Sequence, residues 1–394
     1  MEYVTVRPSY PSAEERGLRV WTITTCELGP SVLVGSPVHS EGLGTPNGRW
    51  HWDGGFRPGL GWIQAGYGID LGTANTVVAG VDGTLLLNEP SVMAVRADGD
   101  RKGQLVAVGG AAKALVGRTP IGMTTVRPLE DGVITDLQTA RSFIVAILKR
   151  VKRQPWQVLP PQAVIGVPWG ATELEKRALI EAVEEAGVGH VDLVPEPIAG
   201  ALGSGLNPLE TRARMVVDVG GGTAEVTAFC FGGILAARSC RTAGDEMTMA
   251  LHQYLRVEHK MLVGELGAEN LKMQLSRNGS GPHSLTAEGR DLASDRARTQ
   301  ELSVDELDAA LRPVTDSIIQ TLASCLQDMP AQAVADVMQD GVLVFGGGSL
   351  VGGFGHRLEE AFGFAVHQAE RPLTCVAEGA AMCLRRPEII KAFG

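Results

Sequence analysis

The chain has 394 residues, which is enough for two domains of ordinary size, each with its own core. Its formal net charge is -10 and only 5% of its residues are aromatic. This composition argues against nucleic-acid binding, which needs clustered basic residues and stacking aromatics. The six cysteines lack zinc-ligand spacing and no apolar run reaches the length of a membrane span, so we expect a cytoplasmic protein.

Residues 1–66 differ from the rest of the chain. They are rich in Gly, Pro and Ser, hold four of the six tryptophans, and show no sustained period of 2 or 3.6. Such a stretch cannot bury a continuous apolar face, so we expect a poorly ordered extension. A real appendage and an over-extended gene model account for this segment equally well.

From Tyr67 onward, strand and helix patterns alternate. Short apolar runs predict strands, and apolar residues at helical spacing predict helices. Thr172 and Glu175 form a capping box that opens one helix, which Gly187 ends. The predicted strands are Tyr67–Leu71, Thr76–Val81, Ala163–Val167 and Met215–Val219, and the other predicted helices cover Leu137–Val151, Asp305–Leu326 and Leu350–Phe362. The order indicates a mixed α/β protein.

One hairpin pattern occurs twice. Asp70–Ala74 follows one apolar strand, and Asp218–Ala224 follows another about 150 residues later; each places an Asp, a Gly turn and a Thr before a second strand. We expect the first hairpin region to end in a type I′ turn at Asp82-Gly83 and the second to end at Gly232-Gly233. Two copies at this spacing predict two related domains that face each other.

The residue types in these hairpins suit a nucleotide triphosphate. Glycines let backbone N–H groups approach phosphate oxygens, and the threonine hydroxyls add donors. An Asp at each strand end suits a hydrated Mg²⁺, which takes few protein ligands. One Asp-x-Gly turn alone is more often a plain hairpin, whereas two copies in the same order favour a phosphate clamp.

A third glycine cluster lies in Val342–Leu350, where a strand runs into three glycines and a helix. Alone it is a weak signal for a ribose or base site. It has neither the Gly-Lys-Ser/Thr of a Walker A loop nor the G-x-G-x-x-G of a dinucleotide fold, which disfavours a P-loop kinase and a dehydrogenase.

These segments resemble the actin, DnaK and sugar-kinase ATPase superfamily, and within it the MreB family of bacterial actins. The resemblance covers about 330 residues in the family's order and spacing. It is carried by GIDLGTANT (68–76), VRPLEDGVITD (126–136), GVPWGATELEKRALIEAVEEAG (166–187), VPEPIAGALGSGL (194–206), MVVDVGGGTAEV (215–226), GRDL (289–292), VLVFGGGSLVGG (342–353) and RPLTCVAEGAAM (371–382). It implies an actin-like ATPase fold of two duplicated RNase H-like domains, 67–205 and 206–394, each with a smaller subdomain, around a nucleotide cleft.

The resemblance also implies roles for individual residues. Asp70 and Asp218 match the aspartates that organise Mg²⁺, and Glu196 matches the residue that orients the attacking water, with Thr223 as a second catalytic candidate. The residues implied to bind ATP are Gly72, Thr73, Ala74, Asn75, Gly220, Gly221, Gly222, Thr223, Glu269, Lys272, Gly346, Gly347, Gly348 and Ser349. Without the resemblance, a Glu before Pro at a helix start would more simply favour the helix dipole.

Some positions depart from the family pattern. Ala224 replaces a threonine that often follows the first, from which we expect slower hydrolysis. Pro195 stands where a second glutamate usually precedes the catalytic position. Asn270 and Leu271 replace the more usual polar pair between Glu269 and Lys272.

The resemblance implies a protein that binds and slowly hydrolyses ATP and polymerises into filaments at the inner membrane, directing cell-wall synthesis and cell shape. Its implied partners are further copies of itself, the cell-wall elongation machinery and inner-membrane proteins. No basic amphipathic helix precedes Tyr67, so membrane attachment rests on the resemblance. Ile121 and Met123 fit either an exposed apolar loop tip or ordinary partly buried positions.

Other functions share the predicted fold. A DnaK-type chaperone needs a long peptide-binding region after the ATPase, and a sugar or acetate kinase needs insertions that build an acceptor pocket; the sequence shows neither. A plasmid-segregating actin and an MreB-like paralogue with a narrower task stay open as alternatives.

Overall fold

The computed structural model describes residues 64–394 except 98–102, 131–132, 135, 152–153 and 277–283. Residues 53–394 fall in one compact unit. The expectation for residues 1–66 falls almost wholly outside the described residues, and the first strand, β1, begins at Gln64.

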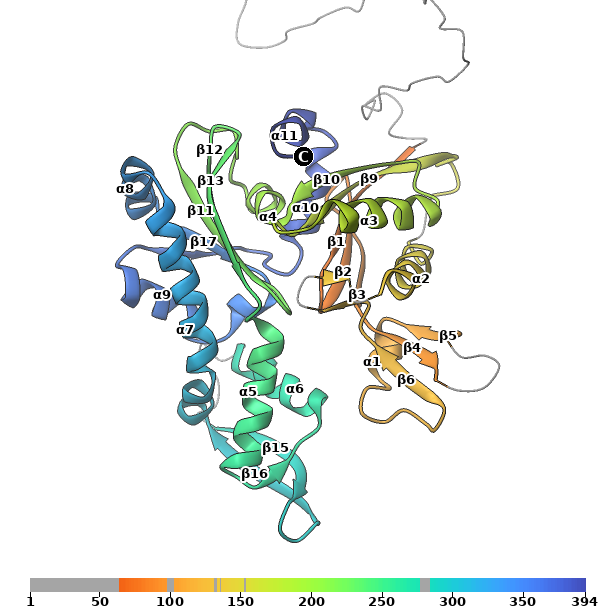
Figure 1. Cartoon of the computed structure of the whole chain (residues 1–394), viewed down its shortest axis with the longest axis vertical. Coiled ribbons are helices and arrows are strands. Elements are labelled where there is room, and N and C mark those ends of the chain that lie inside the picture. The colour runs from red at the N-terminus through yellow and green to blue at the C-terminus, as the bar shows by residue number, and fades with distance from the viewer. Residues whose placement is uncertain (1–63, 98–102, 131–132, 135, 152–153, 277–283) are drawn as a thin grey trace, which may run out of the picture. The chain divides into compact units, whose positions relative to one another are not determined.

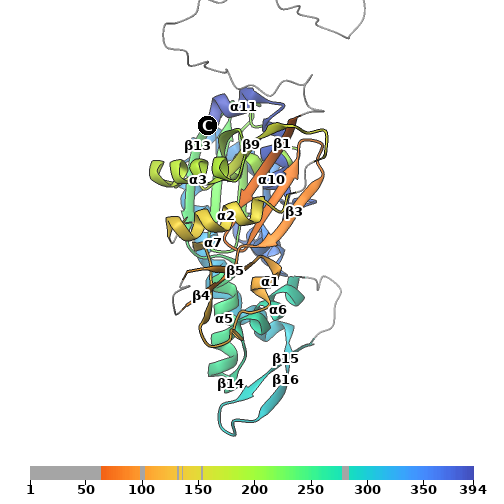
Figure 2. The same ribbon diagram turned by 90° about the vertical axis from the view of Figure 1, so that its right-hand side faces the viewer.

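The first sheet has five strands in the order β10-β9-β1-β2-β3. Strand β1 is antiparallel to β2 and parallel to β9. Its elements are β1 (Gln64–Leu71), β2 (Asn75–Gly80), β3 (Leu85–Pro90), β9 (Leu159–Val167) and β10 (His190–Pro195). Two helices, α2 (Leu137–Leu148) and α3 (Glu173–Glu185), lie along one face (Figure 1 and Figure 2). The predicted capping box of Thr172 and Glu175 is confirmed at the start of α3.

The core of this part comes from the apolar stripe of α2. Phe143, Ile144 and Ile147 are fully buried in one cluster with Ile69 and Ile165 of the sheet. The smaller elements are β4 (Met93–Arg96), β5 (Leu105–Val108), α1 (Gly110–Lys113), β6 (Met123–Val126), β7 (Leu129–Glu130) and β8 (Val133–Ile134). We call residues 64–203 the first lobe.

The second sheet repeats this strand order. It runs β18-β17-β11-β12-β13, with β11 antiparallel to β12 and parallel to β17. Its strands are β11 (Arg214–Val219), β12 (Ala224–Cys230), β13 (Gly233–Cys240), β17 (Val342–Phe345) and β18 (Val366–Gln368). The same order and directions around β1 and β11 confirm the duplication that the paired hairpins predicted, and they fit the actin-like fold that the resemblance implies.

Helices and a small sheet complete this second lobe, residues 214–368. The long helix α7 packs against β12 and β13. The elements are α5 (Gly244–Val257), β14 (Met261–Leu262), α6 (Glu265–Ser276), β15 (Ser284–Asp291), β16 (Ala297–Ser303), α7 (Val304–Asp328), α8 (Ala331–Asp340), a 3₁₀ turn η4 (Gly347–Leu350) and α9 (Phe354–Phe362). The helix expected from Leu350 therefore begins four residues later, after Gly353 in the left-handed region with φ 79°.

The two predicted hairpin turns differ from expectation. Gly83 has φ 82°, but Asp82 does not have the positive φ of a type I′ turn and instead accepts hydrogen bonds from the backbone and hydroxyl of Thr84. In the second lobe Cys230 pairs with Gly233, so the turn is Phe231-Gly232, with φ 48° and 75°. The type I′ pattern thus occurs one residue before the expected glycine pair.

Two helices cross between the sheets. They are α4 (Glu196–Gly203) and α10 (Cys375–Cys383), and α10 also packs against β1 and β2 of the first lobe. A Cβ on Gly379 would collide with the carbonyl of Ala199, and a Cβ on Gly203 would collide with that of Cys375. Glycine is therefore required where the helix backbones touch. The last helix, α11 (Pro387–Phe393), follows α10.

Candidate nucleotide site

A cavity of about 390 Å³ lies between the two lobes. It is lined by all but two of the residues that the sequence assigned to the site. These are Asp70, Gly72, Thr73, Ala74, Asn75, Glu196, Asp218, Gly220, Gly221, Thr223, Glu269, Lys272, Gly346, Gly347 and Gly348. The exceptions are Gly222, which is buried within its loop, and Ser349.

The first glycine loop, residues 72–75, joins β1 to β2. Ser91 holds it from behind: its hydroxyl donates to the carbonyl of Gly72 at 2.6 Å, and its N–H donates to the carbonyl of Ala74 at 2.9 Å. The hydroxyls of Ser91 and Thr76 are 3.0 Å apart and also hydrogen-bonded. These bonds fix the loop on the cavity wall.

The second glycine loop, residues 220–223, joins β11 to β12. The N–H of Gly220 donates to the carbonyl of Thr223 at 2.9 Å. A Cβ on Gly221 would lie 2.9 Å from the Cβ of Ala74 and 3.0 Å from its nitrogen. The two loops are therefore in contact across the lobes, which is the arrangement that a clamp on one triphosphate needs.

The third glycine cluster packs against the end of β11. Gly346 has φ 84°, and a Cβ there would lie 2.5 Å from Oδ1 of Asp218. The hydroxyl of Ser349 donates to the carbonyl of Gly346 at 2.7 Å and accepts from the amide of Gln368 at 3.0 Å. Ser349 is thus placed behind the glycines, where it shapes the loop from the buried side.

Three carboxylates converge at the base of the cavity. Asp70 is the last residue but one of β1, Asp218 lies in the corresponding place on β11, and Glu196 is the first residue of α4. Burial raises the pKa of Asp70 to about 7. Burial, followed by the charge of Asp70, raises the pKa of both Asp218 and Glu196 well above the ordinary range. In this water-poor place the three carboxyl groups therefore resist ionising together.

This donor set fits a magnesium ion. Buried aspartates that repel one another are stabilised by a divalent cation. Among the described residues no group of three or more His, Cys, Asp or Glu side chains is arranged to hold a metal directly. Mg²⁺ suits such a site because it keeps several waters and needs one or two carboxylates with phosphate oxygens.

A fourth carboxylate, Glu225, was missed by the sequence interpretation. Its side chain is 4% exposed and accepts from the N–H of Trp169 at 3.2 Å, so it links β12 of the second lobe to the loop after β9 of the first. Burial raises the pKa of Glu225 to about 7. A charged residue within the apolar run of β12 was the available signal.

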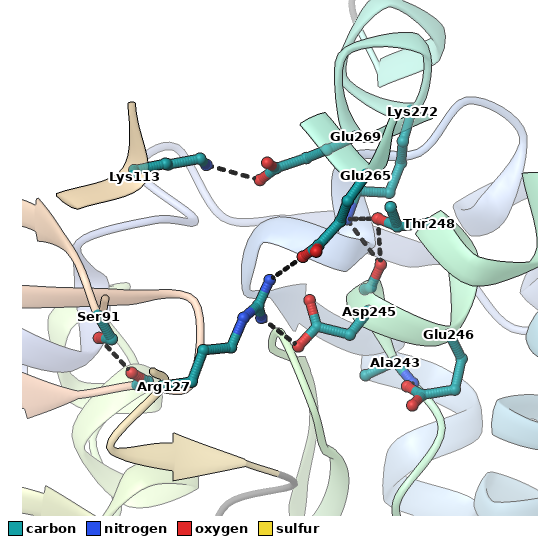
Figure 3. A network of polar contacts seen from close by, with 12 residues as sticks. Ser91, Lys113, Arg127, Ala243, Asp245, Glu246, Thr248, Glu265, Glu269 and Lys272 are labelled. Atoms are coloured by element: carbon teal, nitrogen blue, oxygen red, sulfur yellow. Dashed lines mark hydrogen bonds and ion pairs between the residues drawn. The ribbon is translucent and has the colours of Figure 1, made fainter. Parts of the chain in front are cut away.

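The opposite wall of the cavity is built by α5 and α6. Lys272 donates to the carbonyl of Gly244 at 2.6 Å and to the hydroxyl of Thr248 at 2.9 Å. Burial lowers the pKa of Lys272. Glu269, one helical turn earlier, pairs with Lys113 of the first lobe at 2.8 Å (Figure 3). The sequence gave no sign of this pairing.

Ala224, the expected cause of slower hydrolysis, is fully buried in the core of the second lobe. It is absent from the cavity lining, whereas Thr223 before it is present. The Ala224 side chain therefore packs in the core and does not line the cavity, and slower hydrolysis stays a prediction.

Comparison with known proteins agrees with this arrangement. The family described as MreB/Mbl protein matches residues 64–392. The chain is 36% identical over 320 residues to the cell shape-determining protein MreB of Escherichia coli K12, which spans 80% of this chain and 92% of that protein. It is 34% identical over 319 residues to the cell shape-determining protein Mbl of Bacillus subtilis 168, with 80% and 95% covered.

Solved structures of an MreB protein also resemble this chain. MreB5 of Spiroplasma citri bound to AMPPNP superposes with a TM-score of 0.75 at 29% identity, covering 82% of this chain and 97% of that one. The same protein bound to ADP gives a TM-score of 0.76 at 28% identity. The family match, the identities and the duplicated fold agree, and the chain belongs to the MreB/Mbl family of actin-like proteins.

Proposed function

We propose that this protein binds ATP with Mg²⁺ in the cavity between its lobes, hydrolyses it slowly, and polymerises into filaments at the inner face of the cell membrane that direct cell-wall synthesis and cell shape. The observation that carries the proposal is the contact between the two glycine loops, each of which follows an aspartate near the end of a strand. Supporting it, MreB5 of Spiroplasma citri has been solved with AMPPNP and with ADP, and the curated relatives are named for cell shape.

The chain's own groups suit phosphoryl transfer to water. This chemistry depends on positioning and charge neutralisation more than on covalent help. Gly72, Gly220 and the neighbouring loop residues would hold the phosphates, and Glu196 at the start of α4 would orient a water and accept its proton. Mg²⁺ held by Asp70 and Asp218 would neutralise the phosphate charge and favour the ionised form of Glu196.

Assembly follows from lobe closure. A nucleotide held by both loops links the lobes and stabilises one relative orientation, and loss of the terminal phosphate weakens that link. Contacts between different faces of successive copies do not close on themselves, so they propagate as a filament. The cell-wall elongation machinery and inner-membrane proteins are the partners we propose for the polymer.

Membrane contact is proposed at the loop between α1 and β6. Ile121 at its tip is fully exposed, while Met123 at the start of β6 is partly buried. An apolar side chain held out in solvent suits shallow insertion into a lipid surface. Across the described residues, no helix combines the length and apolarity needed to cross a bilayer.

The test uses the full-length chain. Pelleting and light scattering are recorded with and without Mg²⁺-ATP for the wild type, for Asp218→Ala, and for Asp316→Ala as an exposed acidic control on α7. We expect ATP to promote assembly of the wild type and the control, and Asp218→Ala to lose this response. Equal assembly of all three proteins with and without ATP would disprove the coupling.

A further inference from the structure

We propose that Arg127 is a positioning residue of the nucleotide site: it reaches from the first lobe to the second, beside the cavity, and fixes the second glycine loop. The inference rests on the proposed nucleotide binding and adds to it a residue that controls how long the nucleotide stays bound. Arg127 follows β6 and does not itself line the cavity.

The guanidinium of Arg127 joins the first lobe to two helices of the second (Figure 3). Its Nη1 lies 2.9 Å from Oδ2 of Asp245 on α5, and its Nη2 lies 2.8 Å from Oε1 of Glu265 on α6. Arginine suits this position because its planar fork presents donors in two fixed directions at once.

Asp245 passes this restraint to the glycine loop. It is the second residue of α5, and its own N–H donates to the carbonyl of Gly221 at 2.7 Å. The preceding N–H, of Gly244, donates to the carbonyl of Gly220 at 3.1 Å. Lys272 holds the carbonyl of Gly244 from the other side. Arg127 is therefore two contacts away from the loop that would bind phosphate.

The contacts form a closed circuit through both lobes. Arg127 forms an ion pair with Asp245, whose N–H donates to the carbonyl of Gly221. Gly221 in turn contacts Ala74, which lies in the first lobe like Arg127. The pair between Lys113 and Glu269 spans the cavity in parallel, at 2.8 Å. Opening the lobes requires these bridging pairs to break, so they oppose nucleotide release.

The side chains of Arg127, Asp245 and Glu265 are 30%, 30% and 48% exposed, so their ion pairs are partly screened by solvent. Partly exposed pairs of this kind each change an equilibrium by a fewfold. We therefore expect Arg127→Ala to speed nucleotide dissociation roughly 3- to 10-fold. Turnover at saturating ATP should change less than twofold, so that KM rises while kcat is nearly kept.

The experiment measures release of a fluorescent ATP analogue from the full-length protein by stopped flow. The variants are Arg127→Ala, Arg127→Lys, and Arg141→Ala as a matched control, because Arg141 pairs with Glu185 inside the first lobe. Arg127→Lys keeps the charge but loses the fork, so it should fall between the wild type and Arg127→Ala. Thermal unfolding without nucleotide should change equally in Arg127→Ala and Arg141→Ala.

The dependence of the release rate on ionic strength is a second measurement, and it would not differ between the wild type and Arg127→Ala if Arg127 had only a structural role. Raising ionic strength should speed release from the wild type more than from Arg127→Ala, since the variant has already lost the screened pairs. Equal release rates and equal salt dependence in the wild type and Arg127→Ala would overturn the inference. If the wild type does not bind the analogue at all, the proposed function fails instead.

Discussion

The crossing of α4 and α10 makes a sharp stability prediction through Gly379. A Cβ added there would collide with the carbonyl of Ala199 and would lie 2.7 Å from the nitrogen of Gly203. The Gly203 nitrogen alone would require the two helices to part by 0.7 Å to restore ordinary contact at 3.4 Å, and the closer carbonyl of Ala199 requires more. Both obstacles are backbone atoms, so no side chain can turn aside to make room.

The expected cost follows from this geometry. Overpacking a well-packed interior costs about 1–3 kcal/mol, and rigid backbone on both sides places Gly379→Ala near the upper limit. The gain in helix propensity from Gly to Ala returns up to about 1 kcal/mol. We therefore expect a net loss of about 2 kcal/mol in the free energy of unfolding, which is a large share of the stability of an ordinary domain.

Denaturant unfolding of the nucleotide-free protein measures this loss. The matched control is Gly355→Ala in α9, where the nearest atom to an added Cβ is Cγ1 of Val366 at 3.6 Å, an ordinary contact. The control should be unchanged or slightly stabilised, because it gains helix propensity without a clash. Equal unfolding midpoints for Gly379→Ala and Gly355→Ala would refute the close helix crossing.

Three further predictions concern the site and the surface. Glu196→Gln should keep nucleotide binding and reduce phosphate release roughly tenfold or more, and unchanged turnover would remove Glu196 from the mechanism. Because burial raises the pKa of Glu225 from 4.5 to about 7, the folded state retains a proton that the unfolded chain releases between these values, so the free energy of unfolding falls as pH rises through that window. Glu225→Gln should reduce this fall by up to about 2 kcal/mol between pH of about 5 and about 7 in denaturant unfolding, whereas an unaltered pH slope would contradict the assignment. Ile121→Glu should weaken cosedimentation with anionic lipid vesicles roughly tenfold, while Leu174→Glu, an exposed position on α3, should not; equal effects would exclude the loop as the membrane contact.

The local parts of the site were predictable from the sequence. Each phosphate loop consists of consecutive residues, because backbone approach to a phosphate requires glycine at fixed positions. The pattern is an apolar strand with an Asp near its end, then one or more glycines and a Thr. The duplication of that pattern also predicted two related domains, and β1 and β11 hold equivalent places in two sheets of the same strand order. The second hairpin turn was predicted one residue too late, because a two-residue turn can hold a bulky residue such as Phe231 at positive φ when the strand register requires it.

The contacts that join the lobes were not predictable in the same way. Arg127 and Asp245 are 118 positions apart, and Lys113 and Glu269 are 156 apart. In the sequence each is one charged residue among many, and most charged residues on a helix or loop are simply solvated. Only the fold decides which of them meet, so a single sequence carries no pairing signal for them.

The helix crossing between the two sheets and the ion pairs across the cavity differ in strength, and this difference decides where motion occurs. At the crossing of α4 and α10, backbone touches backbone, and close-packed interiors of this kind resist separation. Across the cavity, the lobes are joined by partly exposed ion pairs of Arg127 and Lys113, which break and re-form at small cost. Opening should therefore occur on the ion-pair side, with the helix crossing as the pivot. A nucleotide held by both glycine loops adds a further link on that side, and its differential affinity for the closed arrangement sets how far the equilibrium shifts.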